Sequence, residues 1–463
     1  MSKRIFLTIV LVVLAAVMVA PTLAQEPVTI NWFVGLGGGT SDQQLEAQAQ
    51  VVEDFNASHP EINLVLSVAP TFETAIDTLS TLIAAGTPPD VIGPVGVGGS
   101  NRYEWLDLSE LMEANSYDLS GFDPALVDLY ATNNGGFSAI PFGVFPSVIY
   151  YNRGLFDEAG LNYPPQEFGA PYVMPDGSEV AWDYDTLAEI AKILTVDGNG
   201  ADATSADFDP DNIVQFGLNF QFARMRLMWS DLQPETTYYD AETNTVAVPE
   251  SWTQATEWLQ ERIWTDHSIP STSYAVSEAI GAGSENVFNA GKVGMAVAPL
   301  WYTCCIGDSV DNFEWDMAVV PASFDGEQHV ALDADTFRIP VGSAHPEEAF
   351  VVLQYLLNEA VPVLAPTYGA FPARAEYQQG WIDSNSARYD WDVNWQVAVD
   401  SLGYANPSAA HHESNLPNWS QVYDREFSLQ TELFGDSGAD LDVAAAIEAF
   451  QTDVQTIVET TSN

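Results

Sequence analysis

The strongest constraint on the fold is an alternation of strand-like and helix-like segments near the start of the chain. Residues 28–34 and 62–68 are apolar runs rich in β-formers, whereas residues 45–56 and 72–85 carry apolar side chains at helical spacing. A short third strand is expected at residues 90–92. Strands that alternate with helices through short loops form parallel sheets. The sequence therefore predicts an α/β fold with a mainly parallel sheet.

Two glycine-rich loops follow strands of this predicted sheet. Residues 35–39 come directly after the first strand, and residues 93–99 come after the third. In parallel α/β sheets, ligands bind at the carboxyl ends of strands, and glycine lets the backbone approach a ligand closely. Both loops are therefore candidate ligand-binding segments. Thr40 and Asp42, which follow the first loop, are candidate site residues.

The rest of the chain alternates less regularly. Strands are expected at residues 147–151, 214–219, 293–298, 317–320 and 337–341, and helices at residues 184–194, 253–264 and 346–358. From Trp419 onward the sequence predicts two helices that are separated by residues 435–438. A chain of 463 residues holds about two to three domains. Because no low-complexity linker interrupts the sequence, we expect its lobes to be joined by ordinary strands.

The first 24 residues have the pattern of a cleaved signal peptide. Lys3 and Arg4 precede an apolar run at residues 5–20, and small residues at 21–24 offer a cleavage site before Gln25. The alternative is a membrane anchor, but the run is shorter than the ~20 residues that a span requires. No cysteine lies near the cleavage point, so no lipid anchor is expected. We therefore predict an extracytoplasmic protein, either periplasmic or secreted.

The charge balance excludes one class of partner. The chain has 65 acidic residues against 13 Lys and Arg, a formal net charge of −52. No basic stripe is present to neutralise phosphates, which excludes nucleic acid as a partner, and the charge also argues against anionic membrane surfaces. With 47% hydrophobic residues the composition is that of a globular protein.

Six segments of the chain, taken in order, resemble one protein family. They are VVEDFNASHPEINL (51–64), LIAAGTPPDVI (82–92), IPFGVFPSVIYYNRGLFDEAGL (140–161), FNAGKVGMAVAPLW (288–301), FRIPVGSAHPEEAFVVLQYLL (337–357) and YGAFPAR (368–374). Their order and spacing resemble the extracellular solute-binding proteins of ABC importers, the family of maltose-binding and related sugar-binding proteins. Together they span most of the chain after residue 24.

This resemblance implies two α/β lobes that close by hinge motion around a ligand held in the cleft between them. Lobe one would comprise residues 26–142 and 336–368, and lobe two would comprise residues 143–335 and 369–463. The chain would cross between the lobes near residues 142–147, 333–336 and 368–371. The resemblance also implies that permease subunits of an ABC importer are the partners of a monomeric receptor.

Three aromatic residues are candidate walls of the ligand site. The resemblance places a sugar-stacking aromatic at Trp301 and a second aromatic wall at Phe222, while Phe145 lies on the first crossing. Aromatic faces suit the apolar faces of sugar rings. The alternative for each of these side chains is packing in the core.

Polar candidates come from the other crossings and from the resemblance. Asp335, next to Asp333 on the second crossing, is expected to accept sugar hydroxyls, and Tyr368 and Gly369 form the third crossing. Gly96 replaces a position that often carries a polar ligand-binding side chain in the family. Trp419 is similar to the residue that closes the site from the C-terminal side.

Two further features have open interpretations. Cys304 and Cys305, the only cysteines, form either a vicinal disulfide beside the ligand or two buried small side chains. The loop at residues 197–212 carries several Asp and Asn side chains that are possible calcium ligands. It lacks the Gly and the Glu of the EF-hand pattern, so we expect a solvated turn and no metal site.

The sequence favours a receptor over an enzyme. It contains no G-x-S-x-G elbow, no H-E-x-x-H helix and no P-loop, and no cofactor is expected. We predict a non-enzymatic receptor that binds a mono- or oligosaccharide and delivers it to the importer. The alternatives are a receptor for a polyol, a glycerol-phosphate derivative, a polyamine or a peptide, and a secreted hydrolase.

Overall fold

The computed structural model describes residues 26–460 except 96–103, 129, 132–135, 224, 233–236, 241, 276, 278–285, 307–312 and 407–415. The N-terminal elements are β1 (Val28–Val34), α1 (Asp42–Ser58), β2 (Ile62–Val68), α2 (Phe72–Ala84), β3 (Val91–Val95), α3 (Ser109–Ala114), α4 (Pro124–Asp128) and β4 (Ile140–Asn152). The predicted signal peptide, residues 1–24, lies outside the described residues.

The middle of the chain contains most of the short elements. They are α5 (Arg153–Ala159), β5 (Tyr172–Val173), β6 (Glu179–Val180), α6 (Tyr184–Leu194), β7 (Val196–Asp197), the 3-10 helix η2 (Pro210–Asn212), β8 (Ile213–Phe220), α7 (Met225–Leu232), β9 (Tyr239–Asp240), β10 (Thr245–Val246), α8 (Glu250–Trp264), α9 (Thr272–Ala275), β11 (Val293–Pro299), the 3-10 helix η3 (Leu300–Cys304), β12 (Trp315–Ala318) and β13 (Val330–Arg338).

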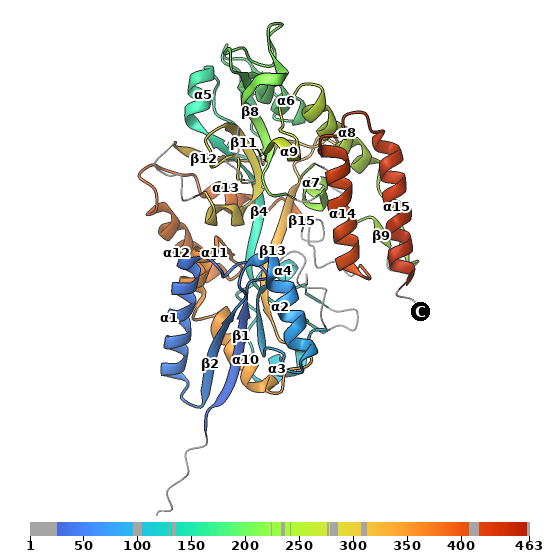
Figure 1. Cartoon of the computed structure of the whole chain (residues 1–463). Helices are drawn as coiled ribbons and strands as arrows, with labels where there is room; N and C mark the ends of the chain where they lie inside the picture. The colour runs from blue at the N-terminus through green and yellow to red at the C-terminus, as the bar shows by residue number, and fades with distance from the viewer. Residues whose placement is uncertain are drawn as a thin grey trace, which may run out of the picture.

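The C-terminal part is mainly helical. Its elements are α10 (Pro346–Leu357), α11 (Val361–Tyr368), β14 (Phe371–Pro372), α12 (Ala375–Ser386), α13 (Gln396–Ser401), β15 (Ala405–Asn406), α14 (Trp419–Phe434) and α15 (Val443–Thr460). Figure 1 shows an elongated molecule with two α/β halves, one around β1, β2, α1 and α2 and the other around β8, β11, α5 and α6. The strands β4 and β13 run between these halves.

A single sheet path connects the two halves. Its strand order is β2-β1-β3-β13-β4-β11-β8-β7, with β12 and β14 paired to β4 and β15 paired to β13. The pairs β1–β2, β1–β3 and β11–β8 are parallel, as predicted for the N-terminal strands. The central pairs β3–β13, β13–β4 and β4–β11 are antiparallel. The prediction of a mainly parallel sheet is therefore correct for β2-β1-β3 and for β11-β8, and wrong for the centre and for the edge strand β7, which is antiparallel to β8.

The long strand β4 serves both halves of this sheet. Its residues 140–146 pair with β13, whereas its residues 147–152 pair with β11 and β12. The predicted lobe boundaries at residues 142–143 and 335–336 fall inside β4 and β13. The exact division of the chain into lobes stays a prediction.

Most predicted elements are found close to their predicted bounds. The strands at 28–34 and 62–68 and the helix at 184–194 agree to the residue, and the C-terminal helices are separated near residues 435–438. Helix α1 begins at Asp42 because Ser41 caps it, with its hydroxyl accepting from the backbone of Gln44. Such local signals explain why the outer elements follow the sequence pattern.

The two central strands differ from their predictions. We predicted strands at residues 147–151 and 337–341, but β4 begins at Ile140 and β13 spans Val330–Arg338. Pro141, Gly143 and Pro146 disfavour an interior strand by propensity, which masked the first half of β4. In β13 two aspartates interrupt the apolar run. Tertiary pairing overrides these local preferences.

The helices of this fold pack against a common core. Helix α10 places Phe350, Leu353 and Leu356 in the main hydrophobic cluster, while α2 covers β1 and β3 through Ala75 and Leu79. Within the described residues, no single helix has the length and apolar character to cross a membrane. Only α10 and α11 taken together, which meet at a bend of 69°, reach that length and composition.

Candidate functional site

The first two predicted crossings lie side by side in the centre of the sheet. In the antiparallel pair β13–β4, Asp333 lies opposite Phe145 and Asp335 lies opposite Gly143. Side chains two residues apart on a strand share a face, and so do directly opposed residues. Asp333, Asp335 and Phe145 are therefore on one face of the sheet. The two carboxylates are nearly buried, with 3% and 8% of the residue surface exposed.

Two aromatic residues and Asp333 form a cluster beyond the ends of strands β8 and β11. The indole Nε1 of Trp301 donates a hydrogen bond to Asp333 Oδ2 over 3.1 Å. The rings of Trp301 and Phe222 are stacked, with their centroids 6.3 Å apart and their planes at 29°. Both side chains are partly exposed. We call these three residues, Phe222, Trp301 and Asp333, the Trp301 cluster.

The sheet explains why these residues meet. Strands β8 and β11 are parallel neighbours, and Phe220 lies opposite Val297 near their ends. The chain leaves both strands at the same edge of the sheet, which brings Phe222 and Trp301 together. Trp301 lies in the 3-10 helix η3 that follows β11. Phe222 has a left-handed backbone with φ of 57°, a conformation that non-glycine residues rarely adopt.

The first glycine-rich loop lies beside the third crossing. The N–H of Gly39 donates to Gln44 Oε1 over 2.8 Å, and Gln48 Nε2 donates to the carbonyl of Gly39 over 3.0 Å. Gly39 has φ of +99°, and a Cβ there would lie 2.9 Å from Gln48 Nε2. A Cβ on Gly38 would lie 3.6 Å from Tyr368 Cδ1. Gly39 is therefore needed for the close packing of the loop against α1, whereas the contact of Gly38 with Tyr368 would leave room for a Cβ and it is the φ of +143° that favours glycine there.

The candidates after this loop are placed differently from each other. Thr40 is half-buried, whereas Asp42 is exposed at the start of α1. Tyr368 is buried, and burial raises the pKa of its hydroxyl well above the usual range, with Gln48 opposing the rise and Asp335 adding to it. Because Asp335 acts on the Tyr368 hydroxyl, the second and third crossings lie close enough to interact electrostatically.

The third crossing also contacts the segment that carries Trp301. Gly369 ends helix α11 in the left-handed conformation, with φ of 67°. Its carbonyl accepts a hydrogen bond from the hydroxyl of Thr303 in η3 over 3.5 Å. The structure therefore brings together Asp335, Tyr368 and Gly369 on one side and the Trp301 cluster on the other, joined by β13 and η3.

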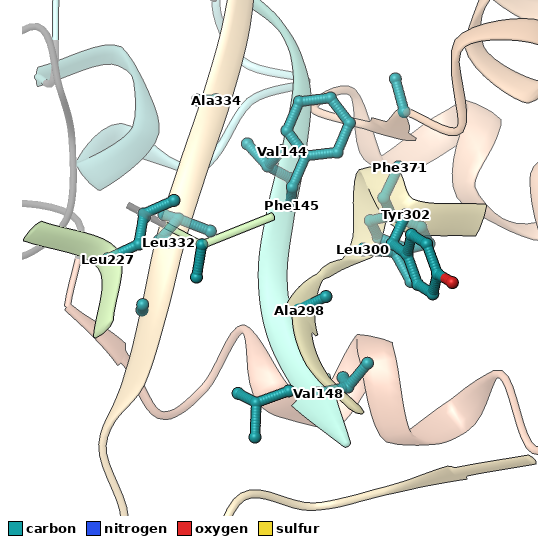
Figure 2. Close-up of a cluster of buried hydrophobic side chains, with 14 of the residues drawn as sticks. Val144, Phe145, Val148, Leu227, Ala298, Leu300, Tyr302, Leu332, Ala334 and Phe371 are labelled. Atoms are coloured by element: carbon teal, nitrogen blue, oxygen red, sulfur yellow. The ribbon is translucent and has the colours of Figure 1, made fainter. Parts of the chain in front are cut away.

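Phe145 differs from the other aromatic candidates because it is buried, with 1% of its surface exposed. Figure 2 draws it within a cluster of buried hydrophobic side chains from β4, β13 and neighbouring elements. Such burial is expected for core packing. A contact between Phe145 and a ligand stays a prediction.

Three predicted features fall wholly or partly outside the described residues. Gly96 lies in the part of the chain that is not described. Trp419 is the first residue of α14, and its side chain is not described. Cys305 is disulfide-bonded. The side chain of Cys304, the other cysteine, is not described, so the vicinal pairing stays a prediction.

The acidic loop at residues 197–212 is organised by hydrogen bonds to one carboxylate. Asp197 is 1% exposed, which corrects the prediction of a solvated turn at this residue. Its oxygens accept the backbone N–H groups of Asn199, Ala201 and Asp209 over 2.8 to 2.9 Å. Burial raises the pKa of Asp197, but these donors outweigh it and the pKa lies below its usual range. Among the described residues, no group of three His, Cys, Asp or Glu side chains is placed to hold a metal ion.

Sequence reasoning missed one buried carboxylate next to the crossings. Asp231 of α7 is 1% exposed, and its Oδ1 accepts the backbone N–H of Ala331 in β13 over 3.3 Å. Burial raises its pKa to about 7, while the Ser147 hydroxyl of β4 and the Ala331 N–H oppose the rise. A single Asp in a short helix carries no local signal of burial. Only the three-dimensional position of α7 against β4 and β13 reveals it.

Relatives with curated names match this chain over different lengths. A candidate binding protein of Brucella abortus, BAB2_0491, is 23% identical over 426 residues, which cover 86% of this chain and 87% of the relative. The sn-glycerol-3-phosphate-binding periplasmic protein UgpB of Rhizobium meliloti is 24% identical over 155 residues, which cover 31% of this chain and 34% of that protein.

Solved structures agree with the observed fold. The ABC substrate-binding protein Lmo0181 of Listeria monocytogenes, in complex with cycloalternan, has a TM-score of 0.72 at 17% identity and covers 93% of this chain and 99% of its own. The maltose/maltodextrin-binding domain MalE of Bdellovibrio bacteriovorus, bound to maltotriose, has a TM-score of 0.66 at 16% identity, with 93% and 100% covered. Both support a two-lobed α/β fold.

The family itself is identified by sequence. The family description "Bacterial extracellular solute-binding protein" matches residues 38–361, which is more than half of the chain. The matched range contains the end of the first glycine-rich loop, both long crossing strands and the Trp301 cluster. This family implies a small-molecule ligand, an ABC permease as partner, and a periplasmic or secreted location. The protein therefore belongs to the bacterial extracellular solute-binding proteins, the receptors of ABC importers.

Proposed function

We propose that this receptor binds a mono- or oligosaccharide between its two halves and delivers it to an ABC importer without altering it. The observation that carries the proposal is the Trp301 cluster, in which a stacked aromatic pair lies next to a nearly buried carboxylate. Sugar rings present apolar C–H faces and a rim of hydroxyls. Aromatic rings suit the faces, and carboxylates accept from the hydroxyls.

The arrangement of the crossings supports capture by closure. Strands β4 and β13 run through both halves of the molecule. The Trp301 cluster and Asp335 lie where these strands pass from one half to the other. A ligand that contacts both halves would favour the closed form, because it stabilises the state with which it makes more contacts. In this proposal Thr40, Asp42, Gly96 and Trp419 complete the site. Release would then depend on the importer.

Two of the structural neighbours have oligosaccharides as ligands, maltotriose in the Bdellovibrio protein and cycloalternan in the Listeria protein. At 16% and 17% identity these likenesses concern the fold, and the ligand comes to this chain only as part of the proposal.

A second candidate is sn-glycerol 3-phosphate, because the Rhizobium protein that binds it matches about a third of this chain. Against this candidate, Asp333 and Asp335 place two carboxylates on one face of the sheet. A phosphate next to these two carboxylates would be repelled by them, whereas an uncharged sugar would not. An uncharged carbohydrate is therefore the better match to the observed side chains.

Isothermal titration calorimetry of the protein from residue 25 onward tests the proposal. The probes are maltose, maltotriose, glycerol, sn-glycerol 3-phosphate and spermidine. We expect a sugar to bind, and we expect Trp301→Ala to weaken that binding about 30-fold, as for aromatic residues at the centre of binding sites. Tyr163→Ala is the matched control, since Tyr163 is 41% exposed in the same half but outside the cluster.

Several outcomes would contradict the proposal. Binding of the phosphate ester alone would favour the second candidate, and binding of spermidine alone would indicate a site dominated by carboxylates. Equal loss of sugar binding in both variants would mean that Trp301 acts through stability only. Chromatography of the sugar after incubation separates a receptor from a hydrolase, because a receptor returns its ligand unchanged.

A further inference from the structure

Two glutamines of helix α1 hold the same residue of the first glycine-rich loop. Gln44 Oε1 accepts from the N–H of Gly39 over 2.8 Å, and Gln48 Nε2 donates to the carbonyl of Gly39 over 3.0 Å. The two side chains lie on one face of the helix because they are four residues apart. We call Gln44, Gln48 and Gly39 the glutamine clamp. It fixes the peptide group that joins Gly39 to Thr40, a candidate site residue.

The two glutamines of the clamp differ in what else they do. Gln44 Oε1 also accepts from the N–H of Ser41 over 3.3 Å, which is half of the capping box at the start of α1. Gln48 lies one turn further into the helix, with 0% of its surface exposed, and its amide donates to the loop. A change at Gln44 would therefore disturb the helix start as well, whereas a change at Gln48 acts on the loop and leaves the cap intact.

The loop is packed closely around the hydrogen bond from Gln48. Gly39 has φ of +99°, and a Cβ on it would lie 2.9 Å from Gln48 Nε2 and 3.0 Å from Val34 Cβ. A Cβ on Gly38 would lie 3.6 Å from Tyr368 Cδ1. The Gln48 side chain also lies close enough to the Tyr368 hydroxyl to oppose the rise in its pKa. Gln48 is therefore placed to hold the loop to the third crossing.

We propose that Gln48 is a positioning residue of the sugar site, which holds the first glycine-rich loop beside Tyr368 and so keeps Thr40 in the conformation that binds the ligand. This inference rests on the proposed function. Because Gln48 is fully buried, it acts on a ligand through the loop and not by contact. When a site is competent for only part of the time, its apparent affinity falls by that fraction. A loop released from Gln48 would therefore bind sugar more weakly.

The chain offers a matched control in the same helix. Gln48→Met keeps a side chain of similar length but has no N–H to donate. Gln50→Met makes the same change at an exposed position, where Nε2 donates to Asp54 Oδ1 within α1. Gln48→Glu, studied at pH 5, keeps a donor. Burial and the facing Gly39 carbonyl both favour its protonated carboxyl, whose O–H can replace the amide N–H.

The hydrogen bond at Gly39 can be observed directly. Only Thr40 and Thr87 follow a glycine in this sequence, so protein labelled with 13C-carbonyl glycine and 15N-threonine gives two signals in a carbonyl-filtered amide spectrum. The Thr40 signal reports on the Gly39 carbonyl that accepts from Gln48. The N–H of Thr87 donates to the carbonyl of Leu82 at the end of α2, so its signal is the internal reference. Thr87→Ser identifies that signal as the one that disappears.

The experiment compares these signals, without sugar, with the affinity for maltose and maltotriose measured by calorimetry at pH 5. We expect Gln48→Met to move the Thr40 signal and to leave the Thr87 signal in place. It should weaken binding of the sugar that the wild type binds by about 10-fold, the effect of one lost hydrogen bond on the competent fraction. Gln50→Met should change neither signal nor affinity, and Gln48→Glu should keep both close to wild type.

Two results would overturn the inference. One is a Thr40 signal that Gln48→Met leaves in place, which would mean that Gln48 does not hold the Gly39 carbonyl. The other is a displaced Thr40 signal with an unchanged sugar affinity, which would mean that the loop does not position the ligand. A wild type that binds neither sugar would instead overturn the proposed function, and the role of Gln48 in sugar binding with it.

Gln48→Glu carries the test alone if Gln48→Met does not fold. Raising the pH ionises its carboxyl and removes the donor, so the Thr40 signal and the affinity should change together. The wild type at each pH is the reference for Tyr368 and Asp335, the titratable groups beside this position. A Thr40 signal that moves while the affinity stays constant would again overturn the inference.

Discussion

Asp197 and Asp231 each have 1% of the residue surface exposed, but Asp197 lies in a shallow loop and Asp231 deep in the core, and their carboxyl groups have opposite pKa shifts. Burial raises the pKa of both side chains. At Asp197 three backbone N–H groups outweigh the burial and the pKa lies below its usual range, whereas at Asp231 one backbone N–H and the Ser147 hydroxyl do not, and the pKa rises to about 7. Depth and donors together decide the charge state: Asp197 lies in a shallow loop with three backbone donors, whereas Asp231 lies deep in the core with fewer donors.

The two carboxylates therefore have different roles: that of Asp197 is structural, and that of Asp231 depends on pH. The pKa of Asp197 is lowered, so its carboxyl group is ionised above the acid range, and its oxygens organise the turn after β7. Asp231 lies on α7 against the paired strands β4 and β13, and burial raises its pKa to about 7. The turn therefore resists changes of pH above the acid range. The segment next to the proposed hinge responds to them.

The largest expected effect is the loss of the Asp197 carboxylate. Asp197→Ala leaves three backbone N–H groups of the loop without their acceptor, each of which then costs free energy in the folded state. We expect the ratio of folded to unfolded protein in urea denaturation to fall at least about 100-fold at pH 7. Because the folded pKa is lowered, the contribution of Asp197 is present above the unfolded pKa and is lost as pH falls through the folded pKa.

Asp202→Asn is the control for this change. Asp202 lies in the same loop and accepts from the backbone N–H and the hydroxyl of Thr204, but that residue pair is more exposed. An amide oxygen can still accept those bonds, so the variant should unfold close to wild type. If both variants lose the same stability, the loop does not depend on Asp197 in the way we describe.

The second effect concerns Asp231 and has the opposite sign. Its pKa is about 7 in the folded protein and about 3.9 in an unfolded chain, so between these values only the folded state keeps the proton. Stability therefore falls as pH rises through this window, and Asp231 accounts for about 3 kcal/mol of the fall between pH 5 and pH 8. Asp231→Asn, which stays neutral, should remove that part.

Urea denaturation at pH 5 and pH 8 measures this effect. Asp231→Asn should exceed the stability of the wild type by about 1.5 kcal/mol at pH 5 and by about 4 kcal/mol at pH 8. The ligand affinity is measured in parallel, because Asp231 contacts β13 and lies beside Ser147 of β4. A variant with the wild-type dependence on pH would show that Asp231 does not titrate in this range.

The same contrast shows what the sequence could and could not predict. Outer elements such as β2 and α6 follow from local periodicity and caps, and the order of six short segments identified the family. Trp301 and Asp333 were placed on separate segments, and the parallel pairing of β8 with β11 brings Trp301 beside Phe222. The hydrogen bond between Trp301 and Asp333 joins residues 32 positions apart. No local pattern specifies such a contact.

The failures of prediction are also physical. The first half of β4 contains two prolines and a glycine, and β13 contains Asp333 and Asp335, so neither resembles an interior strand. These strands are held by pairing on both sides, which overrides propensity. Asp197 was expected to be solvated because it lies in a loop rich in Asp and Asn. Its three backbone donors come from a turn whose shape the sequence does not state.

The smallest expected change in stability concerns Glu426, a buried carboxylate that lies beside an arginine. Glu426 of α14 is 1% exposed, and burial raises its pKa to about 7, while Arg226 and the hydroxyl of Tyr238 oppose the rise. The Tyr238 hydroxyl donates to Glu426 Oε1 over 2.5 Å. Tyr238→Phe removes this donor from the ionised carboxylate, so the pKa of Glu426 should rise further. The further rise matters only above the wild-type folded pKa, where the wild-type carboxyl ionises more readily than that of the variant. We therefore expect a loss of about 1 kcal/mol at pH 8 and little change at pH 5.

Tyr172→Phe is the matched control for Tyr238→Phe. The hydroxyl of Tyr172 donates to the neutral carbonyl of Asn162 over 2.8 Å, so its removal should cost the same at pH 5 and pH 8. A loss that depends on pH for Tyr238→Phe but not for Tyr172→Phe would show that donors to a buried carboxylate act through its charge state. Equal losses at both pH values in both variants would mean that Glu426 stays protonated throughout. In that case, the effect of donors that contributes to the difference between Asp197 and Asp231 would not extend to a carboxylate beside an arginine.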